Sequence, residues 1–149
     1  MVEMKKYIKL VCFVAVLFLF TACPFIDPDT TDTDFKIVNN SDKNILFTFY
    51  FQNNETIDSD KFSPWGNDFE EVKKMRSYIK AHSTYSDRFD SYIIKKHLKT
   101  SWIKYYLFDF DSVSTISWER IRDERIILKE VTFNSWEEME ACNFTITYP

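Results

Sequence analysis

The chain has 149 residues, and its 19 basic and 23 acidic side chains give a formal net charge of −4. This balance offers no basic face of the kind that binds nucleic acid, so we expect no nucleic-acid partner. The single glycine excludes glycine-rich loops that hold nucleotide phosphates, whereas four Trp, eight Tyr and fifteen Phe supply ample material for an apolar core.

The N-terminal segment has the layout of a secretory signal. Lys5, Lys6 and Lys9 make its start basic, and all eleven residues from 10 to 20 are apolar. At about 1.5 Å per residue such a run falls well short of the roughly 30 Å hydrocarbon core of a bilayer. We therefore predict that residues 1–22 are a cleaved signal peptide. The alternative is an uncleaved N-terminal anchor with an incidental cysteine.

The end of this segment, Phe20-Thr21-Ala22-Cys23, resembles the bacterial lipobox, in which small residues precede a cysteine whose thiol takes a diacylglycerol. It departs from that pattern at Phe20, where leucine is usual. The resemblance implies that Cys23 is the lipid attachment site and the first residue of the mature chain. One acyl chain binds a membrane only marginally and two or more hold stably. We expect a protein exported and lipid-anchored to the cell envelope, at the outer membrane.

Residues 24–34 (PFIDPDTTDTD) contain four acids and no base. We interpret residues 23–34 as an acidic, extended tether that precedes a globular domain over 35–149. The tract resembles the acidic signals that direct lipoproteins to the cell surface in some Gram-negative phyla, and the alternative is a plain spacer. Removing the three bases and one acid of the signal leaves 16 bases and 22 acids, a net charge of −6. Cys142 is then left without a partner for an internal disulfide.

The first half of the domain alternates apolar and polar residues. Phe35 and Ile37, a turn over 39–43 and an alternating run over 45–51 predict a β-hairpin. The polar, turn-rich residues 52–66 predict a long surface excursion. The stretch 67–99 is ambiguous, because Asn67 and Asp68 are possible caps of a short helix, whereas 78–83 and 85–94 have the character of strands. We expect two short strands and a brief helical piece there.

The second half alternates strands with helices. Residues 102–108 are apolar on both faces, as in a central strand. Ser117 is a plausible N-cap for a helix over 118–124, and Glu119 suits its first turn. A strand over 126–133 precedes the capping box formed by Ser135 and Glu138, whose helix ends near Cys142, and a last strand spans 144–148.

These elements predict one mainly-β (sandwich-like) or α+β domain with two short helices in its C-terminal half. The tripeptide Ser-Trp-Glu occurs at 117–119 and again at 135–137. It is either one strand–helix unit used twice or a chance match. The connection 111–125 is long enough for a parallel crossover, so a mixed sheet is a further possibility.

The lipobox, the Asn-Asn-Ser-Asp-Lys turn, the segments 108–111 and 117–119 and the closing Thr-Ile-Thr-Tyr-Pro together resemble a group of small lipoproteins of gut-commensal Gram-negative anaerobes. The resemblance covers most of the mature chain and is strongest over 101–149. It implies an envelope location. Its motifs indicate no particular chemistry.

Few residues are candidates for chemistry. His82, His97 and Cys142 lack the spacing of a metal site, so we expect neither metal nor cofactor. Asp109 and Asp111 are the candidate catalytic pair, as acid and base in sugar hydrolysis or as calcium ligands; the alternative is an ordinary strand end.

The tryptophans are candidates for ligand contact. Trp65 lies between proline and glycine in a loop, and it is either an exposed contact for a sugar or protein or a lid over the core. Trp118 and Trp136 are expected to pack onto the sheet. The sequence favours a non-catalytic binding, adhesion or accessory module, partnered by the membrane through Cys23 and by a glycan or envelope protein. The alternative is a small glycan-directed hydrolase that uses Asp109 or Asp111.

Overall fold

The computed structural model describes residues 32–51, 63–66 and 68–149. The signal, Cys23, the tether up to residue 31, residues 52–62 and Asn67 lie outside these ranges. The described residues form seven strands in two sheets and five short helices, most of them in the C-terminal half. They belong to one compact unit from Thr31 to Pro149. The expected β-rich single domain, sandwich-like or α+β, is thus confirmed.

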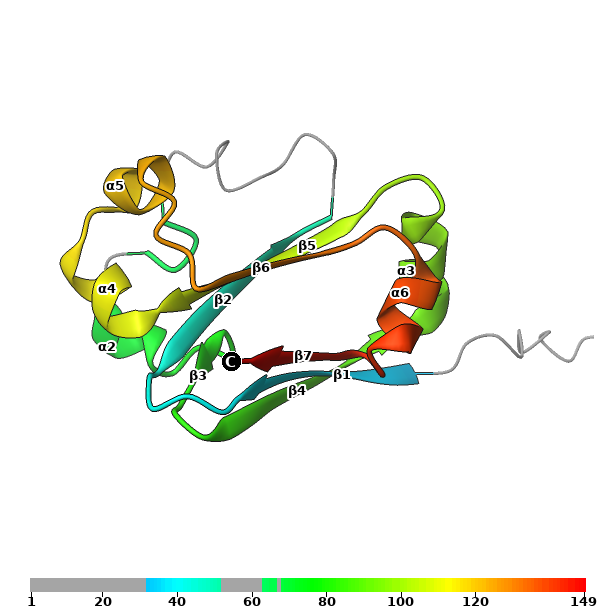
Figure 1. Ribbon diagram of the computed structural model, residues 1–149, viewed down its shortest axis with the longest axis horizontal. Helices are drawn as coiled ribbons and strands as arrows, with labels where there is room; N and C mark the ends of the chain where they lie inside the picture. Colours follow the sequence, from blue (N-terminus) through cyan, green and yellow to red (C-terminus); the bar gives the residue numbers. More distant parts are fainter. Residues whose placement is uncertain (1–31, 52–62, 67) are drawn as a thin grey trace, which may run out of the picture. The chain divides into compact units, whose positions relative to one another are not determined.

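The smaller sheet has the strand order β4-β1-β7 (Figure 1). Strand β1 (Asp32–Asn39) runs antiparallel to β4 (Ser83–Asp90) and parallel to β7 (Thr145–Tyr148). This sheet is mixed, as the sequence allowed. β1 starts three residues before the expected domain boundary, and residues 32–34, assigned to the tether, pair with 88–90 of β4.

The larger sheet is antiparallel throughout, in the order β3-β2-β5-β6. Its strands are β2 (Ile45–Tyr50), β3 (Tyr78–Ile79), β5 (Ile103–Asp109) and β6 (Lys129–Phe133). The prediction of a central strand is confirmed, because β5 lies between β2 and β6 and buries both faces. The antiparallel pairing of β5 with β6 rules out a parallel crossover through 111–125.

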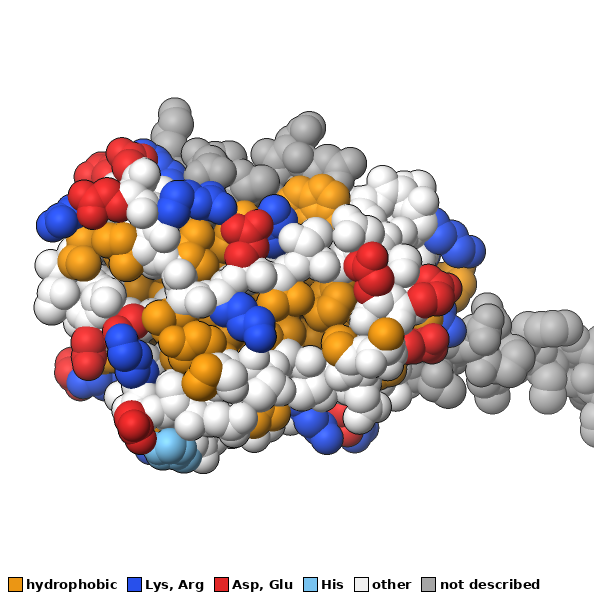
Figure 2. Space-filling model, in the orientation of Figure 1, with side chains coloured by type: hydrophobic (Ala, Val, Ile, Leu, Met, Phe, Trp, Pro, Cys, Tyr) orange, Lys and Arg blue, Asp and Glu red, His pale blue; other side chains and the backbone are white. Residues whose placement is uncertain are grey.

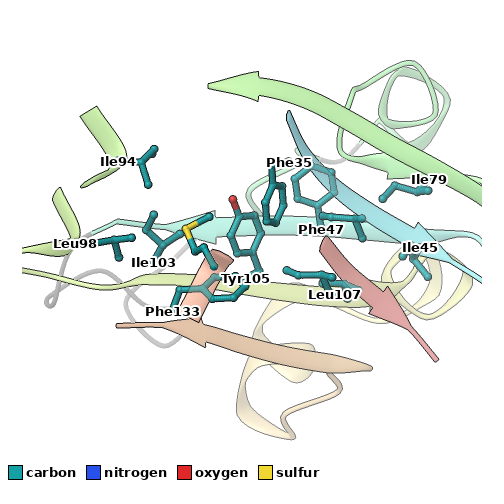
Figure 3. Packing of buried hydrophobic residues seen from close by; sticks show 13 residues of the cluster. Phe35, Ile45, Phe47, Ile79, Ile94, Leu98, Ile103, Tyr105, Leu107 and Phe133 are labelled. Carbon is teal, nitrogen blue, oxygen red and sulfur yellow. The ribbon is translucent and has the colours of Figure 1, made fainter. Parts of the chain in front are cut away.

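The main core fills the space between the two sheets. It combines Phe35 and Ile37 of β1 with the inward side chains of β2 and β5. Figure 3 shows the Phe35 ring lying against that of Tyr105, with Ile94 and Leu98 at one end; the two ring centroids are 4.8 Å apart. The edges of β6 and β7 are linked by the Lys129 ammonium, which donates to the Thr147 carbonyl over 2.6 Å. Apolar side chains reach the surface between β6 and β7 (Figure 2).

A second core, the outer core, lies on the face of the larger sheet that is turned away from the smaller sheet. Tyr106 and Phe108 of β5 point to this face, where three short helices cover them. These helices are α2 (Phe69–Val72), α4 (Phe110–Thr115) and α5 (Trp118–Asp123). The domain therefore has three layers, and the apolar residues on both faces of β5 are explained by two cores.

The predicted hairpin between the first two strands is wrong. β1 and β2 lie in different sheets, and the turn 40–44 crosses between them. Asn39, only 1% exposed, holds the crossing in place: its amide nitrogen donates to the carbonyls of Lys43 (2.7 Å) and Lys80 (3.0 Å), and its oxygen accepts from Ser41. Local alternation is the same for a hairpin and for such a crossing, because it does not encode the strand partner.

Helix α3 (Ser91–Leu98) occupies residues where the sequence suggested the end of a strand. The Asp90 carboxylate accepts hydrogen bonds from the backbone N–H groups of Tyr92 and Ile93 and so caps the helix. Ile94 and Leu98, one turn apart, are buried in the main core. Strand β4 therefore ends at Asp90, because this residue caps α3. In the same region α2, capped by Asp68, confirms the expected helical piece.

The two Ser-Trp-Glu segments form matching helical units. Each serine caps a six-residue helix, α5 or α6 (Trp136–Ala141), with tryptophan as its first residue. Each helix ends in a Schellman motif whose left-handed residue, Arg125 or Asn143, lies eight positions after the serine. The two units pack against different cores: Trp118 contacts the outer core and Trp136 contacts the main core.

Candidate functional site

A pocket of about 240 Å³ lies where α4 passes into α5. The described residues that line it are uncharged, and several carry hydroxyl groups. They are Ser63, Gly66, Phe69, Val113, Ser114, Thr115, Ile116, Ser117, Trp118 and Ile121. This combination of hydroxyl and aromatic side chains is the chemistry that recognises a neutral polyol.

The hydroxyls of the pocket have fixed hydrogen-bond roles. Those of Ser114 and Thr115 donate to the Asp111 carbonyl, each over 2.9 Å, so their oxygens remain available as acceptors. The Ser117 oxygen accepts from the Arg120 N–H as the cap of α5, and the Ser63 oxygen accepts from the Trp65 N–H. The O–H groups of these two serines can donate. The pocket thus presents both donors and acceptors, as a sugar hydroxyl requires.

The aromatic side of the pocket is supported from the core. Trp118, half-buried, packs edge-on against Trp65 at a centroid separation of 5.7 Å and lies tilted against Phe108 at 6.0 Å. The expectation that Trp118 packs towards the sheet is confirmed, and the same side chain also lines the pocket. Sequence reasoning missed this site, because its hydroxyls come from helix ends and a loop with no shared motif.

Trp65 is not an exposed contact. It is 4% exposed, and its indole nitrogen donates to the Phe47 carbonyl over 3.1 Å. This bond lies beside the start of β3, which pairs only with Ile45 and Leu46 of β2. The alternative interpretation, a lid over the core, is the correct one. The position of Trp65 between Pro64 and Gly66 favoured exposure, but the Phe47 carbonyl at the edge of β2 is a buried acceptor for its indole N–H.

Asp109 and Asp111 lie on either side of the β5–α4 junction. The Asp109 carboxylate accepts from the Asp111 N–H (3.1 Å) as the N-cap of α4 and pairs with the Lys43 ammonium at 2.6 Å. This hydrogen bond to Asp109 raises the pKa of Lys43. Neither carboxylate lines the pocket at α4 and α5. The geometry gives Asp109 a capping role, as in the strand-end interpretation.

The remaining candidates are dispersed. His82 bonds to the Asp42 carboxylate at 2.8 Å, and His97 packs edge-on against Phe51. The Cys142 thiol donates to the Met139 carbonyl at the end of α6. Across the described ranges no three His, Cys, Asp or Glu side chains are grouped as a metal site would need.

Two other hollows are lined by described residues. A slot of about 90 Å³ opens between the sheets and is lined mostly by aromatic rings, with Asp87 as its charged member. In this slot burial and a hydrogen bond to Asp87 raise the pKa of Tyr85 to about 12, and burial also raises the pKa of Tyr105. A shallower groove along β3 and β4 is lined by Lys73, Arg76 and Lys80. The first two of these already pair with Glu70 and Asp87.

Comparison with known proteins adds no functional assignment. No protein-family model matches the chain, and no curated protein or solved structure matches it either. Within the described ranges, none of the helices has the length and apolar character of a membrane span.

Proposed function

We propose that this chain is an exported lipoprotein, anchored to the cell envelope through Cys23, whose domain is a non-catalytic module that binds a neutral glycan. The anchor rests on the basic start, the apolar run and the Thr-Ala-Cys boundary. The glycan rests on one observation, the pocket at α4 and α5, whose described lining is uncharged and combines oriented hydroxyls with Trp118. Its volume, about 240 Å³, suits a single sugar ring rather than an extended chain.

The binding proposal is tested with the full-length mature protein in detergent against arrayed neutral oligosaccharides. Ser114 is the residue to change, because its hydroxyl lines the pocket without capping a helix. Ser114→Ala removes one acceptor and should weaken binding about 2- to 10-fold. Ser114→Leu fills the pocket and should abolish binding.

Ser112→Ala is the matched control, because it lies in the same helix outside the pocket lining. Equal affinity of the three variants would contradict the assigned site. A parallel hydrolysis assay on the same sugars tests the alternative function: sugar release that Asp109→Asn or Asp111→Asn abolishes would replace the binding module by the hydrolase.

The anchor is tested by labelling cells with a radioactive or alkyne fatty acid. Cys23→Ser should abolish lipid labelling and leave a larger, unprocessed precursor, because the thiol that takes the diacylglycerol is gone. Cys142→Ser is the matched control and should label normally, since Cys142 lies at the end of α6 within the domain. Normal labelling of Cys23→Ser would refute the anchor.

A further inference from the structure

Helix α3 presents an apolar surface to solvent that its neighbours leave uncovered. Ile93 is 60% exposed and Tyr92 is 45% exposed, although both belong to an eight-residue helix whose opposite side is buried in the main core. Lys96 and Lys99 are exposed too and follow at helical spacing on the same side. Residues 91–98 contain no acid. We call Tyr92, Ile93, Lys96 and Lys99 the α3 face.

The α3 face lies at the end of the domain where the tether joins it. Asp32, the first residue of β1, is the strand partner of Asp90, which caps α3. Directly opposed residues of antiparallel strands have Cα atoms about 4.5–5.5 Å apart. In Figure 1, α3 and the start of β1 lie at the same end of the sheets, and α4 and α5 lie at the other. Tyr92 and Ile93 therefore lie close to Asp32, where the tether from Cys23 joins the domain.

The length of that chain limits how far the domain can be from the membrane. Eight residues separate Cys23 from Asp32. A fully extended peptide spans at most about 3.6 Å per residue, so the tether reaches no more than about 30 Å. A lipid on Cys23 consequently holds the Asp32 end of the domain near the bilayer surface, and the α3 face is an exposed apolar surface at that end.

We propose that the α3 face docks on the surface of the bilayer that holds the lipid of Cys23. Ile93 and Tyr92 would enter the interface between headgroups and acyl chains, and Lys96 and Lys99 would reach the lipid phosphates. This inference rests on the proposed anchor.

Several neighbouring acids already have partners within the domain. Asp32 and Asp34 pair with Arg88, at 3.9 and 3.3 Å, and Asp90 is engaged as the cap of α3. On the adjacent α6, Glu140 accepts from the Trp136 indole N–H. In this orientation the hydroxyl-lined pocket at α4 and α5 faces away from the bilayer, because these helices lie at the opposite end of the sheets from α3. A glycan can therefore enter the pocket.

The test uses the full-length mature lipoprotein with one spin label. Cys142→Ser removes the free thiol, and Ile93→Cys then places the label on the α3 face. Met75→Cys is the control position, because Met75 is an exposed apolar residue after α2. The protein is reconstituted in phosphatidylcholine vesicles that contain phosphatidylglycerol, and collision rates with oxygen and with a water-soluble nickel chelate are compared.

We expect oxygen collisions to exceed nickel collisions at position 93 and the reverse at position 75. Replacing Lys96 and Lys99 by Glu should weaken docking and so raise the collision rate of the label at position 93 with the nickel chelate. A vesicle-bound, lipidated protein whose label at 93 meets the nickel chelate as often as the label at 75 would overturn the docking and leave the anchor intact. Mass spectrometry of the same sample reports the lipid, and its absence would refute the anchor and the docking together.

Discussion

The indole of Trp65 should be the most costly side chain to remove from the outer core. It is almost fully buried, packs edge-on against Phe108 at 5.0 Å and supplies the hydrogen bond to the Phe47 carbonyl beside the start of β3. Truncation of a buried tryptophan to alanine costs about 3–5 kcal/mol. We therefore expect Trp65→Ala to lower the free energy of unfolding of residues 31–149 by that amount, a large fraction of the about 5–15 kcal/mol typical of a domain.

Trp65→Phe separates packing from hydrogen bonding. Phenylalanine keeps most of the apolar contact but leaves the Phe47 carbonyl without the indole donor, which should cost about 1–3 kcal/mol. Urea unfolding measures both values, and with a slope of about 1–3 kcal/mol/M the alanine variant should shift the midpoint by at least about 1 M. The exposed Met75→Ala should stay within about 0.5 kcal/mol. A loss below that value for Trp65→Ala would refute the burial of Trp65 and restore it as an exposed contact.

Two further predictions concern the cap at the β5–α4 junction and the tyrosines between the sheets. Asp109→Ala should lower the free energy of unfolding by about 0.5–2 kcal/mol because α4 loses its N-cap, whereas Asp111→Ala should change it by less than about 0.5 kcal/mol in the same urea titration. Unfolded tyrosines ionise near pH 10, whereas the folded-state pKa of Tyr85 is about 12. Between about pH 10 and pH 12 the unfolded state therefore loses this proton and the folded state keeps it, so the free energy of unfolding should fall over this range. The double variant Tyr85→Phe/Tyr105→Phe should flatten this decline, and an unchanged alkaline profile would contradict the role of these phenols.

The elements that the sequence predicts well carry their own local signals. The Ser117 and Ser135 caps, the two-sided apolar strand over β5 and the alternation of β7 depend on residues a few positions apart. Local hydrogen bonding and periodicity decide such features wherever the element is placed in the fold. For the same reason the sequence predicts which side chains of β2 face the same way.

The pairing of strands depends on distant residues, and there the sequence misleads. The turn after Asn39 has the composition of a hairpin, yet the Lys80 carbonyl, far along the chain, helps to fix it as a crossing between sheets. Trp65 resembles an exposed loop aromatic until the short β3 is known to leave an acceptor at Phe47. The pocket at Ser114 and Trp118 is likewise assembled from two helix ends and a loop, and single-sequence patterns do not report such convergence.

The structure also changes how the acidic tract must be tested as a signal for surface display. Asp32 and Asp34 belong to β1 and pair with Arg88, so replacing them would perturb the smaller sheet as well as the charge of the tract. Asp27 and Asp29 precede the strand in the sequence, and replacing these two by Asn removes two acids of the tract and leaves the residues of β1 unchanged. If the tract directs display, protease added to intact cells should degrade the parent protein and spare the Asp27→Asn/Asp29→Asn variant. The matched control is Asp111→Asn/Glu119→Gln, which removes two exposed acids of the domain outside the tract and should stay sensitive to protease. Equal sensitivity of all three proteins would make residues 24–31 a plain spacer.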